Sequence, residues 1–379
     1  MQLSVIILNY NVRYFLELCV LSVQYAIKNL DAEIIVVDNN SPDDSCDMMK
    51  LRFPEIQLIK NQENSGFPKG NNMGVAAAKG KYICILNPDT VVAEDTFTKV
   101  IARHEAIFTN CGIVGCKLID GTGNFLPESK RGIPTPFVAF TKIFGLYSVS
   151  NYFGKYYAQH LNSNQSGNVE ILVGAFMVMT RELYNEVGGF DENCFMYSDD
   201  IDLSYMVLKK GFQNYYYADS SVIHFKGEST VKDHTYMTRF QQAMDFFYKK
   251  HFKKSVFFSV FMKIGIVVFS IIKKRQGKPQ NTVSPKHYIF ISNNSSLKDI
   301  LEKNLKKPIQ IVQITPAILG SKQIEIIFDN NFLSFQNIIN QMEVFKKPNI
   351  TFKILPKNSN FIIGSNSSNE RGEVIVFDL

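Results

Sequence analysis

Two aspartates follow strand-like apolar runs directly, at places where a carboxylate can do chemistry. Asp89 follows the run Tyr82–Leu86 within the turn signal Asn87-Pro88-Asp89, and Asp38 follows the run Glu33–Val37. Apolar β-branched runs that stop at such residues are typical of strands. Asp38 can accept a hydrogen bond from a nucleobase or a ribose hydroxyl, but capping a turn is an equally good interpretation. Asp89 is expected to be exposed where the chain leaves its strand.

Three further segments offer groups that could bind or react. Gly66, Gly70 and Gly74 surround a loop that opens a helix, where free N–H groups and Lys69 suit a phosphate; a flexible surface loop is the alternative. Asp199 and Asp200 start another helical run, and a structural cap would need only one of them. His224 ends a β-type run, where a neutral imidazole can bind a divalent ion, although a lone histidine is more often an ordinary polar residue.

The elements that must position these residues alternate between strand and helix patterns along the first part of the chain. Short connections between such runs predict an α/β sheet with helices on both faces. The first, second and fourth strands end in the polar sequences NYN, DNNS and NPDT. Ligands of open α/β sheets bind at the carboxyl ends of the strands, so these three ends predict one crevice.

Three regions are expected, with boundaries at 1–250, 251–278 and 283–379. The second contains the apolar run Ser255–Ile272, which has Lys263 at its middle and basic clusters at both ends. A lysine at the bilayer centre is costly, so we predict a helix in the membrane interface, with a buried core or dimer helix as the alternative. The third region alternates strand and helix patterns and is expected to be a small α/β domain, structural or interactional, or else a degenerate nucleotide-binding fold.

Composition narrows the class of protein. The chain has 379 residues, 45% of them apolar, a formal net charge of +6 and six cysteines without paired spacing. The mild charge does not call for a nucleic-acid partner, and the cysteines are expected to be reduced thiols of a cytoplasmic protein. The apolar run at the N-terminus has the length of a strand and lacks a basic region before it, so no export signal is expected.

Taken together, the motifs resemble the family 2 glycosyltransferases of the GT-A fold, and within them the rhamnosyltransferase-like branch. Six segments carry the resemblance in the family's order: SVIILNYN, VVDNNSPDDS, NSGFPKGNNMG, ILNPDT, VGAFMVMTRELYNEVGGFDENCFMYSDDIDLSYMVLKKG and VIHFKGEST. It covers about residues 1–250. It implies a mixed sheet with flanking helices and an inverting, metal-dependent transfer of a sugar, best guess rhamnose from dTDP-rhamnose, to a lipid-linked or polysaccharide acceptor at the inner face of a membrane.

The resemblance also implies roles for individual residues. Asp89 would bind Mg²⁺ or Mn²⁺ with His224 as a further ligand, and one or two carboxylates suffice because the ion keeps waters and substrate oxygens. Asp200 would be the catalytic base, with Asp199 beside it. The donor would be held by Asn9, Tyr10, Asn11, Asp38, Gly66, Lys69, Asn71 and Asn87.

The sequence departs from the family pattern at two places. Asp199-Asp200 replaces a Glu-Asp pair, and Met206 stands where the family often has arginine. Lys130 and Arg131 are therefore candidates to grip a lipid-linked diphosphate, with a solvated charge pair as the alternative. Two other classes remain open: a sugar-1-phosphate nucleotidyltransferase, whose Gly-rich basic loop after the first strand is missing, and a catalytically silent nucleotide-sugar-binding module.

Overall fold

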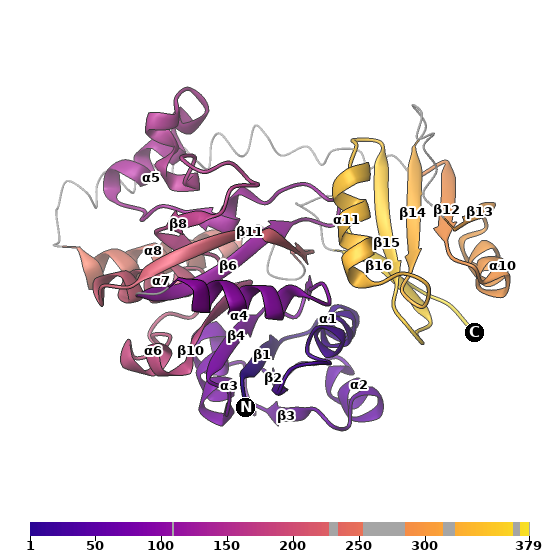
Figure 1. The fold of residues 1–379 in the computed structure, drawn as a ribbon, viewed down its shortest axis with the longest axis horizontal. Helices are drawn as coiled ribbons and strands as arrows, with labels where there is room; N and C mark the ends of the chain where they lie inside the picture. Colours follow the sequence, from indigo (N-terminus) through magenta and orange to yellow (C-terminus); the bar gives the residue numbers. More distant parts are fainter. Residues whose placement is uncertain (108–109, 227–233, 253–284, 314–322, 367–371, 379) are drawn as a thin grey trace.

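The computed structural model describes residues 1–107, 110–226, 234–252, 285–313, 323–366 and 372–378. They form two α/β domains, drawn in indigo to salmon and in orange to yellow in Figure 1. The first is built on a nine-stranded sheet and the second on a six-stranded sheet. The expected fold class, a mixed sheet with flanking helices followed by a small second α/β domain, is confirmed.

The first sheet has the strand order β3-β2-β1-β4-β10-β6-β11-β5, with β8 beside β11. β1 to β4 are parallel, β10 is antiparallel to its neighbours β4 and β6, and β6 is parallel to β11. The carboxyl ends of β1, β2, β4, β6 and β11 therefore share one edge, where ligands of such sheets bind. The strands are β1 (Leu3–Asn9), β2 (Ala32–Asp38), β3 (Gln57–Lys60), β4 (Tyr82–Leu86), β5 (Thr90–Val91), β6 (Cys111–Ile119), β8 (Gly167–Val169), β10 (Phe176–Thr180) and β11 (Gln213–His224).

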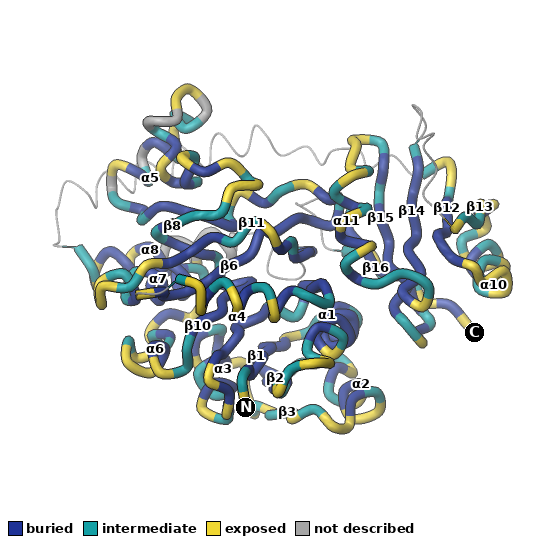
Figure 2. The backbone as a smooth tube through the Cα atoms, in the orientation of Figure 1, coloured by how far each residue is buried: buried dark blue, intermediate teal, exposed yellow. Residues whose placement is uncertain are grey.

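Both faces of this sheet are covered because its central strands are apolar on both sides. Along β1, Val5 and Ile7 join one core whereas Ile6 and Leu8 join the other, as the two-residue period of a strand requires. Figure 2 shows the central strands buried throughout. One core receives α1 (Arg13–Ala26), α2 (Ser45–Arg52) and α4 (Thr96–Ala106), and the other receives α3 (Gly66–Ala77), α6 (Arg181–Glu186) and α7 (Asp199–Lys209). None of the six cysteines is disulfide-bonded.

The segment between β6 and β10 is made of short elements. It carries the acidic Glu128 in η1 (Pro127–Ser129) and then β7 (Lys130–Arg131), α5 (Pro136–Ile143), η2 (Leu146–Ser148), η3 (Asn151–Tyr157) and β9 (Ile171–Leu172). α5 projects from the upper left of the first domain in Figure 1. After β11, α8 (His234–His251) packs against α7. In the part of the chain that the structure describes, no helix has the length and apolarity needed to cross a bilayer; the run Ser255–Ile272 lies outside the described residues.

The second sheet has the order β13-β12-β14-β15-β16-β17. α10 covers one face of it, whereas the apolar side of α11 joins the core of the first domain on the other face. The two domains therefore share a hydrophobic core and pack side by side (Figure 1). The elements are β12 (His287–Ile291), α10 (Ser295–Leu305), β13 (Ile309–Val312), β14 (Ile324–Asp329), α11 (Phe335–Phe345), β15 (Ile350–Leu355), β16 (Phe361–Gly364) and β17 (Glu373–Val376).

Candidate active site

Asp89 and His224, far apart in the sequence, meet at the carboxyl edge of the first sheet. The two-residue strand β5 pairs with the end of β11, so that Thr90 lies opposite His224. His224 Nε2 is 3.3 Å from Asp89 Oδ1, and the N–H of Phe225 donates to the Asp89 carbonyl at 2.9 Å. Both side chains are buried, at 5% and 8% exposure. A carboxylate and an imidazole are thus held together by backbone pairing.

This pair fits a divalent metal. The other imidazole nitrogen, His224 Nδ1, is buried and has no hydrogen-bond partner within the described ranges of the chain, and the same holds for Asn87 Oδ1. The amide nitrogen of Asn87 lies 3.4 Å from His224 Nε2. Among the described residues no group of three or more histidine, cysteine and acidic side chains surrounds a common point. Asp89 and His224 would therefore hold an ion whose remaining ligands are waters and diphosphate oxygens.

The ends of β1 and β2 form a polar floor suited to a nucleoside. Asn9 and Asp38 are register partners, and Asn9 Nδ2 donates to Asp38 Oδ1 at 2.8 Å. The Ser41 N–H donates to Asp38 Oδ2 at 3.0 Å, while the buried Asn9 Oδ1 has no partner in the part of the chain that the structure describes. Asn11 is left-handed at φ 57°, and Tyr10 is 43% exposed. Four predicted donor residues thus stand at one strand edge.

The glycine-containing loop adopts the expected strand-to-helix turn. Gly66 has φ +81° and opens α3; a Cβ there would lie 2.8 Å from the Phe195 side chain, so glycine is needed. Lys69 is exposed in the first turn of α3. Asn71 is fully buried and donates to the Phe67 carbonyl at 2.9 Å, and its Oδ1 has no partner among the described residues. The expected free N–H groups are not found at the start of α3, because Gly66 donates to Asn64 Oδ1 at 3.1 Å, Phe67 donates to the Phe195 carbonyl at 3.0 Å and Pro68 has no N–H. The exposed Lys69 amine is therefore the group of this turn that could meet an anion.

Asp199 and Asp200 begin α7 and are both buried. Asp200 Oδ2 accepts from an Arg131 guanidinium nitrogen at 2.5 Å and from the Gly174 N–H at 3.0 Å. Burial disfavours the charged form of Arg131, but Asp200 and Tyr156 together outweigh burial and raise the pKa of Arg131. Burial, and then the neighbouring Asp200, raise the pKa of Asp199 to about 7, while Arg131 lowers it. The pair therefore divides into a carboxylate tied to arginine and one poised near neutrality.

Comparison with known proteins assigns a family to the N-terminal part of the first domain, which contains Asp38 and Asp89. Residues 4–188 match the model of the family described as glycosyl transferase family 2. The chain carries a family 2 glycosyltransferase domain. It is 23% identical over 211 residues to the N-acetylglucosaminyl-diphospho-decaprenol L-rhamnosyltransferase of Mycobacterium tuberculosis, covering 53% of this chain and 68% of that protein. It is also 23% identical over 282 residues to the low-salt glycan biosynthesis hexosyltransferase Agl10 of Haloferax volcanii, covering 72% and 81%.

Solved structures give a weaker match. The mannosyltransferase PcManGT from Pyrobaculum calidifontis, in complex with GDP-Man and Mn²⁺, aligns with a TM-score of 0.48 and 16% identity over 73% of this chain and 76% of that chain. At this TM-score the similarity supports no argument. The family model and the relatives confirm the prediction that the N-terminal region is a family 2 glycosyltransferase domain with rhamnosyltransferase relatives.

Lys130 and Arg131 occupy different environments in the glycosyltransferase domain. The Lys130 amine donates to the carbonyls of Tyr157, Ala158 and Leu161 at 2.8–3.0 Å. All three of its N–H donors are thus used inside the protein, so the structure does not favour its predicted contact with the acceptor. Arg131 holds Asp200 instead, which makes it a partner of the predicted base rather than a free phosphate ligand.

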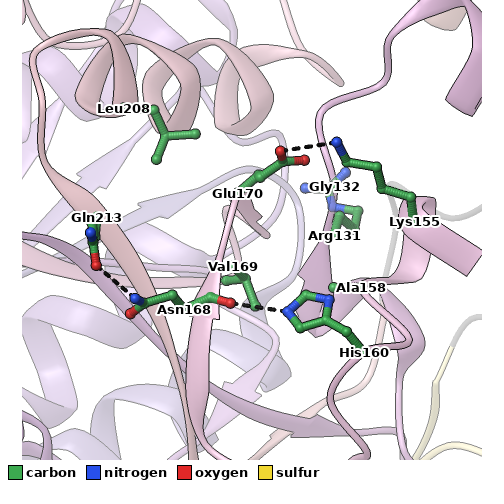
Figure 3. A pocket seen from close by; sticks show the side chains of 10 residues that line it. All are labelled: Arg131, Gly132, Lys155, Ala158, His160, Asn168, Val169, Glu170, Leu208 and Gln213. Atoms are coloured by element: carbon green, nitrogen blue, oxygen red, sulfur yellow. Dashed lines mark hydrogen bonds and ion pairs between the residues drawn. The ribbon is translucent and has the colours of Figure 1, made fainter.

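A cavity of about 340 Å³ lies beside Arg131 (Figure 3). Its polar side chains pair with one another: Lys155 with Glu170 at 3.3 Å, and Asn168 with Gln213 at 2.6 Å. His160 Nε2 lies 3.2 Å from the Asn168 carbonyl (Figure 3). These groups are satisfied within the wall, so the cavity is not assigned a ligand.

Sequence reasoning missed two residues of the glycosyltransferase site. Asn39 joins two loops, since its Oδ1 accepts from Asn61 and Ser65 while its Nδ2 donates to Asn64 at 2.9 Å. The only signal in the sequence was its position after Asp38. Tyr197, directly before the N-cap of α7, has φ +79°, a strained value for a bulky residue, and no sequence pattern announces it.

Proposed function

We propose that the chain is a metal-dependent, inverting glycosyltransferase that moves a sugar from a nucleoside-diphosphate donor to a lipid-linked or polysaccharide acceptor. One observation carries the proposal: the Asp89–His224 pair and the Asp199–Asp200 pair lie at the same edge of one sheet, beside the polar floor of Asn9 and Asp38. A transfer reaction needs these three components together.

The donor half is assigned to the ends of β1, β2 and β4. Asp38 and Asn9 would hold the nucleoside through the carboxylate and the free amide oxygen, and Tyr10 offers an exposed ring for stacking. Gly66, Lys69 and Asn71 would follow the diphosphate. A bound Mg²⁺ or Mn²⁺ would neutralise the charge of the leaving diphosphate.

The acceptor half is assigned to the start of α7. One carboxylate of the pair would accept the proton of the acceptor hydroxyl as the sugar bond breaks, a contribution of roughly 10²–10⁴-fold. Asp200 is the predicted base, and Asp199, whose pKa is raised to about 7, is the second candidate. A single displacement assisted by one base inverts the anomeric carbon and needs no covalent intermediate.

The donor and the acceptor are proposed by analogy with relatives. The M. tuberculosis relative is named as an L-rhamnosyltransferase acting on a diphospho-decaprenol-linked sugar. This name supports rhamnose as the first sugar to test and a polyprenyl-diphosphate-linked sugar as the first acceptor. The family resemblance makes dTDP-rhamnose the first form of the donor. Pocket shape decides such specificity, so the assignment requires a donor panel.

Peripheral binding to the inner face of the membrane is supported by the projecting segment around α5. Residues 129–169 contain no aspartate or glutamate. Phe137, Phe144 and Val149 are 44–77% exposed there. Exposed apolar side chains on a projecting segment without acidic residues favour contact with the membrane interface. Sedimentation with phosphatidylglycerol vesicles tests this, and deletion of residues 255–275 should reduce binding if that segment lies in the interface.

The test of the proposed function is a donor panel. Purified protein is incubated with nucleotide sugars and Mn²⁺ or Mg²⁺, and nucleotide release is followed for the wild type, Asp89→Ala and Asp200→Asn. We expect release from one donor, dTDP-rhamnose first, and its loss in both variants. Unchanged turnover in both variants would refute the site assignment. No release from any donor would favour a silent binding module.

A further inference from the structure

The second domain contacts the loops that carry the proposed metal ligands. Its α11 and β16 face the carboxyl edge of the first sheet, where α1 begins and where β6 and β11 end (Figure 1). We propose that the C-terminal domain is a positioning element, which holds the segments on either side of the Asp89–His224 pair. The inference rests on the proposed roles of these two residues and adds a function for a domain that has none assigned.

The first contact grips the segment that follows Asp89. Glu94 Oε1 and Oε2 accept from the N–H groups of Phe335 and Gln336 at 2.7 and 2.8 Å, at the start of α11. The Gln336 side chain donates in turn to Asp95 at 2.7 Å. The first N–H groups of a helix have no partner within it, and the helix dipole favours a negative charge there. Glu94 thus fixes the chain five residues after Asp89 to the other domain.

The second contact joins β11, the strand that ends at His224, to its neighbour β6. Glu343 of α11 reaches Lys117 Nζ on β6 at 2.5 Å and accepts from Ser221 Oγ on β11 at 2.8 Å. Lys117 and Ser221 are register partners on these neighbouring strands. Ser221 stands three residues before His224 on the same strand. One carboxylate therefore ties both strands to α11 just before the metal ligand.

The third contact is aromatic and reaches the Asp89 backbone in three steps. A Cβ on Gly372 would lie 2.1 Å from the Phe15 ring, so the two are in close contact. Phe15 packs on Phe225 with ring centroids 5.4 Å apart. The Phe225 N–H donates to the Asp89 carbonyl at 2.9 Å. The C-terminal domain thus supports the residue after His224 through α1.

External support matters here because the pairing that joins Asp89 to His224 is short. β5 has two residues, and among the described strands it pairs with β11 alone, at the end of the sheet. Two-stranded pairing of this length is marginal without packing against other elements. The three contacts lie on Glu94 and Asp95 shortly after β5, on Ser221 within β11, and on Phe225 directly after β11. The domain is therefore placed to set the distance between the two proposed metal ligands.

The test uses the full chain with Glu94→Gln and Glu343→Gln. Neither residue is in the catalytic or binding machinery. Glu302→Gln is the matched control, because Glu302 accepts from the Ile309 N–H at 2.6 Å on the α10 side, away from the first domain. Hydrogen exchange without metal is measured at residues 87–95 and 221–225, and the affinity for dTDP is measured by calorimetry with Mn²⁺.

We expect faster exchange in both segments and about tenfold weaker Mn²⁺-dependent nucleotide binding in Glu94→Gln and Glu343→Gln, as from the loss of one charge-assisted hydrogen bond. The control should match the wild type. The double variant Lys117→Glu/Glu343→Lys should recover part of the loss. Unchanged exchange in both segments, or an equal effect of Glu302→Gln, would overturn the proposal. If the wild type binds no nucleotide, the proposed function fails, whereas the exchange data still decide the positioning role.

Discussion

Removing the Arg131 guanidinium tests the buried ion pair at the start of α7. In Arg131→Met the apolar stem is kept, while the 2.5 Å contact with Asp200 and the 3.1 Å bond to the Leu172 carbonyl are lost. The side chains of Arg131 and Asp200 are 9% and 12% exposed. Breaking such a pair from one side leaves a buried charge with too few partners, which costs about 3–5 kcal/mol. We expect this loss in the free energy of unfolding.

Lys155, which lies with Arg131 in the segment between β6 and β10, provides a matched control. Lys155 pairs with Glu170 at 3.3 Å but is 57% exposed, and exposed pairs contribute about 0–1 kcal/mol. Lys155→Met should therefore be nearly neutral. The double variant Arg131→Met/Asp200→Asn removes both charges and should cost less than Arg131→Met alone, because no unpaired charge remains.

Urea unfolding followed by far-ultraviolet circular dichroism measures these differences, since the chain has no tryptophan to report on them. Equal midpoints for Arg131→Met and Lys155→Met would refute the claim that this ion pair is buried and coupled. A double variant less stable than Arg131→Met would refute the claim that the cost comes from an uncompensated charge.

Three further predictions concern the site. If Asp199 is the base, it must be deprotonated, so the transfer rate should rise with pH through about 7. Arg131→Met should move this rise to higher pH, because Arg131 lowers the pKa of Asp199. A flat rate from pH 6 to 8 would contradict a role of Asp199 as the base. His224→Ala should weaken Mn²⁺ binding, measured by Mn²⁺ electron spin resonance, whereas an unchanged affinity would exclude His224 as a ligand. Gly70→Ala should cost about 1–3 kcal/mol in urea unfolding, because its Cβ would lie 2.4 Å from Leu8 Cδ1; a neutral result would show that α3 can shift away from β1.

The strand ends were predictable because the signal is local. Buried strands need continuous apolar runs, and the residues at which these runs stop are visible in the sequence, as at Asn9, Asp38 and Asp89. Parallel pairing then brings the first two together, and the structure places them in register. The part of the site that depends on strand ends thus follows from composition and period.

Contacts between distant segments could not be predicted. The approach of His224 to Asp89 depends on the pairing of β5 with β11. A strand of two residues is too short to be predicted from a sequence pattern. Arg131 and Asp200 are 69 residues apart in the sequence, and no pattern in either segment indicates a contact with the other. Adjacent residues of a strand point to opposite sides, so only one of Lys130 and Arg131 could reach the acidic pair, but the sequence does not say which.

The second domain was predicted correctly as an α/β unit but was expected to be separate. Its α11 has an apolar face of Phe335, Ile338, Ile339 and Met342, and a sequence shows such a face without showing what it covers. The structure places this face in the core of the first domain. Glu94 and Glu343, which read as ordinary surface acids, are contacts between the domains for the same reason.

The central claim is that the site divides into a donor half that binds the metal and an acceptor half that carries the base. The most direct test compares nucleotide binding by the wild type, Asp89→Asn and Asp200→Asn. The measurement is calorimetric titration of dTDP with and without Mn²⁺. The structure predicts Mn²⁺-dependent binding that Asp89→Asn abolishes and Asp200→Asn keeps, because Asp89 stands beside His224 and Asp200 is tied to Arg131. Equal binding by both variants and the wild type would contradict the account.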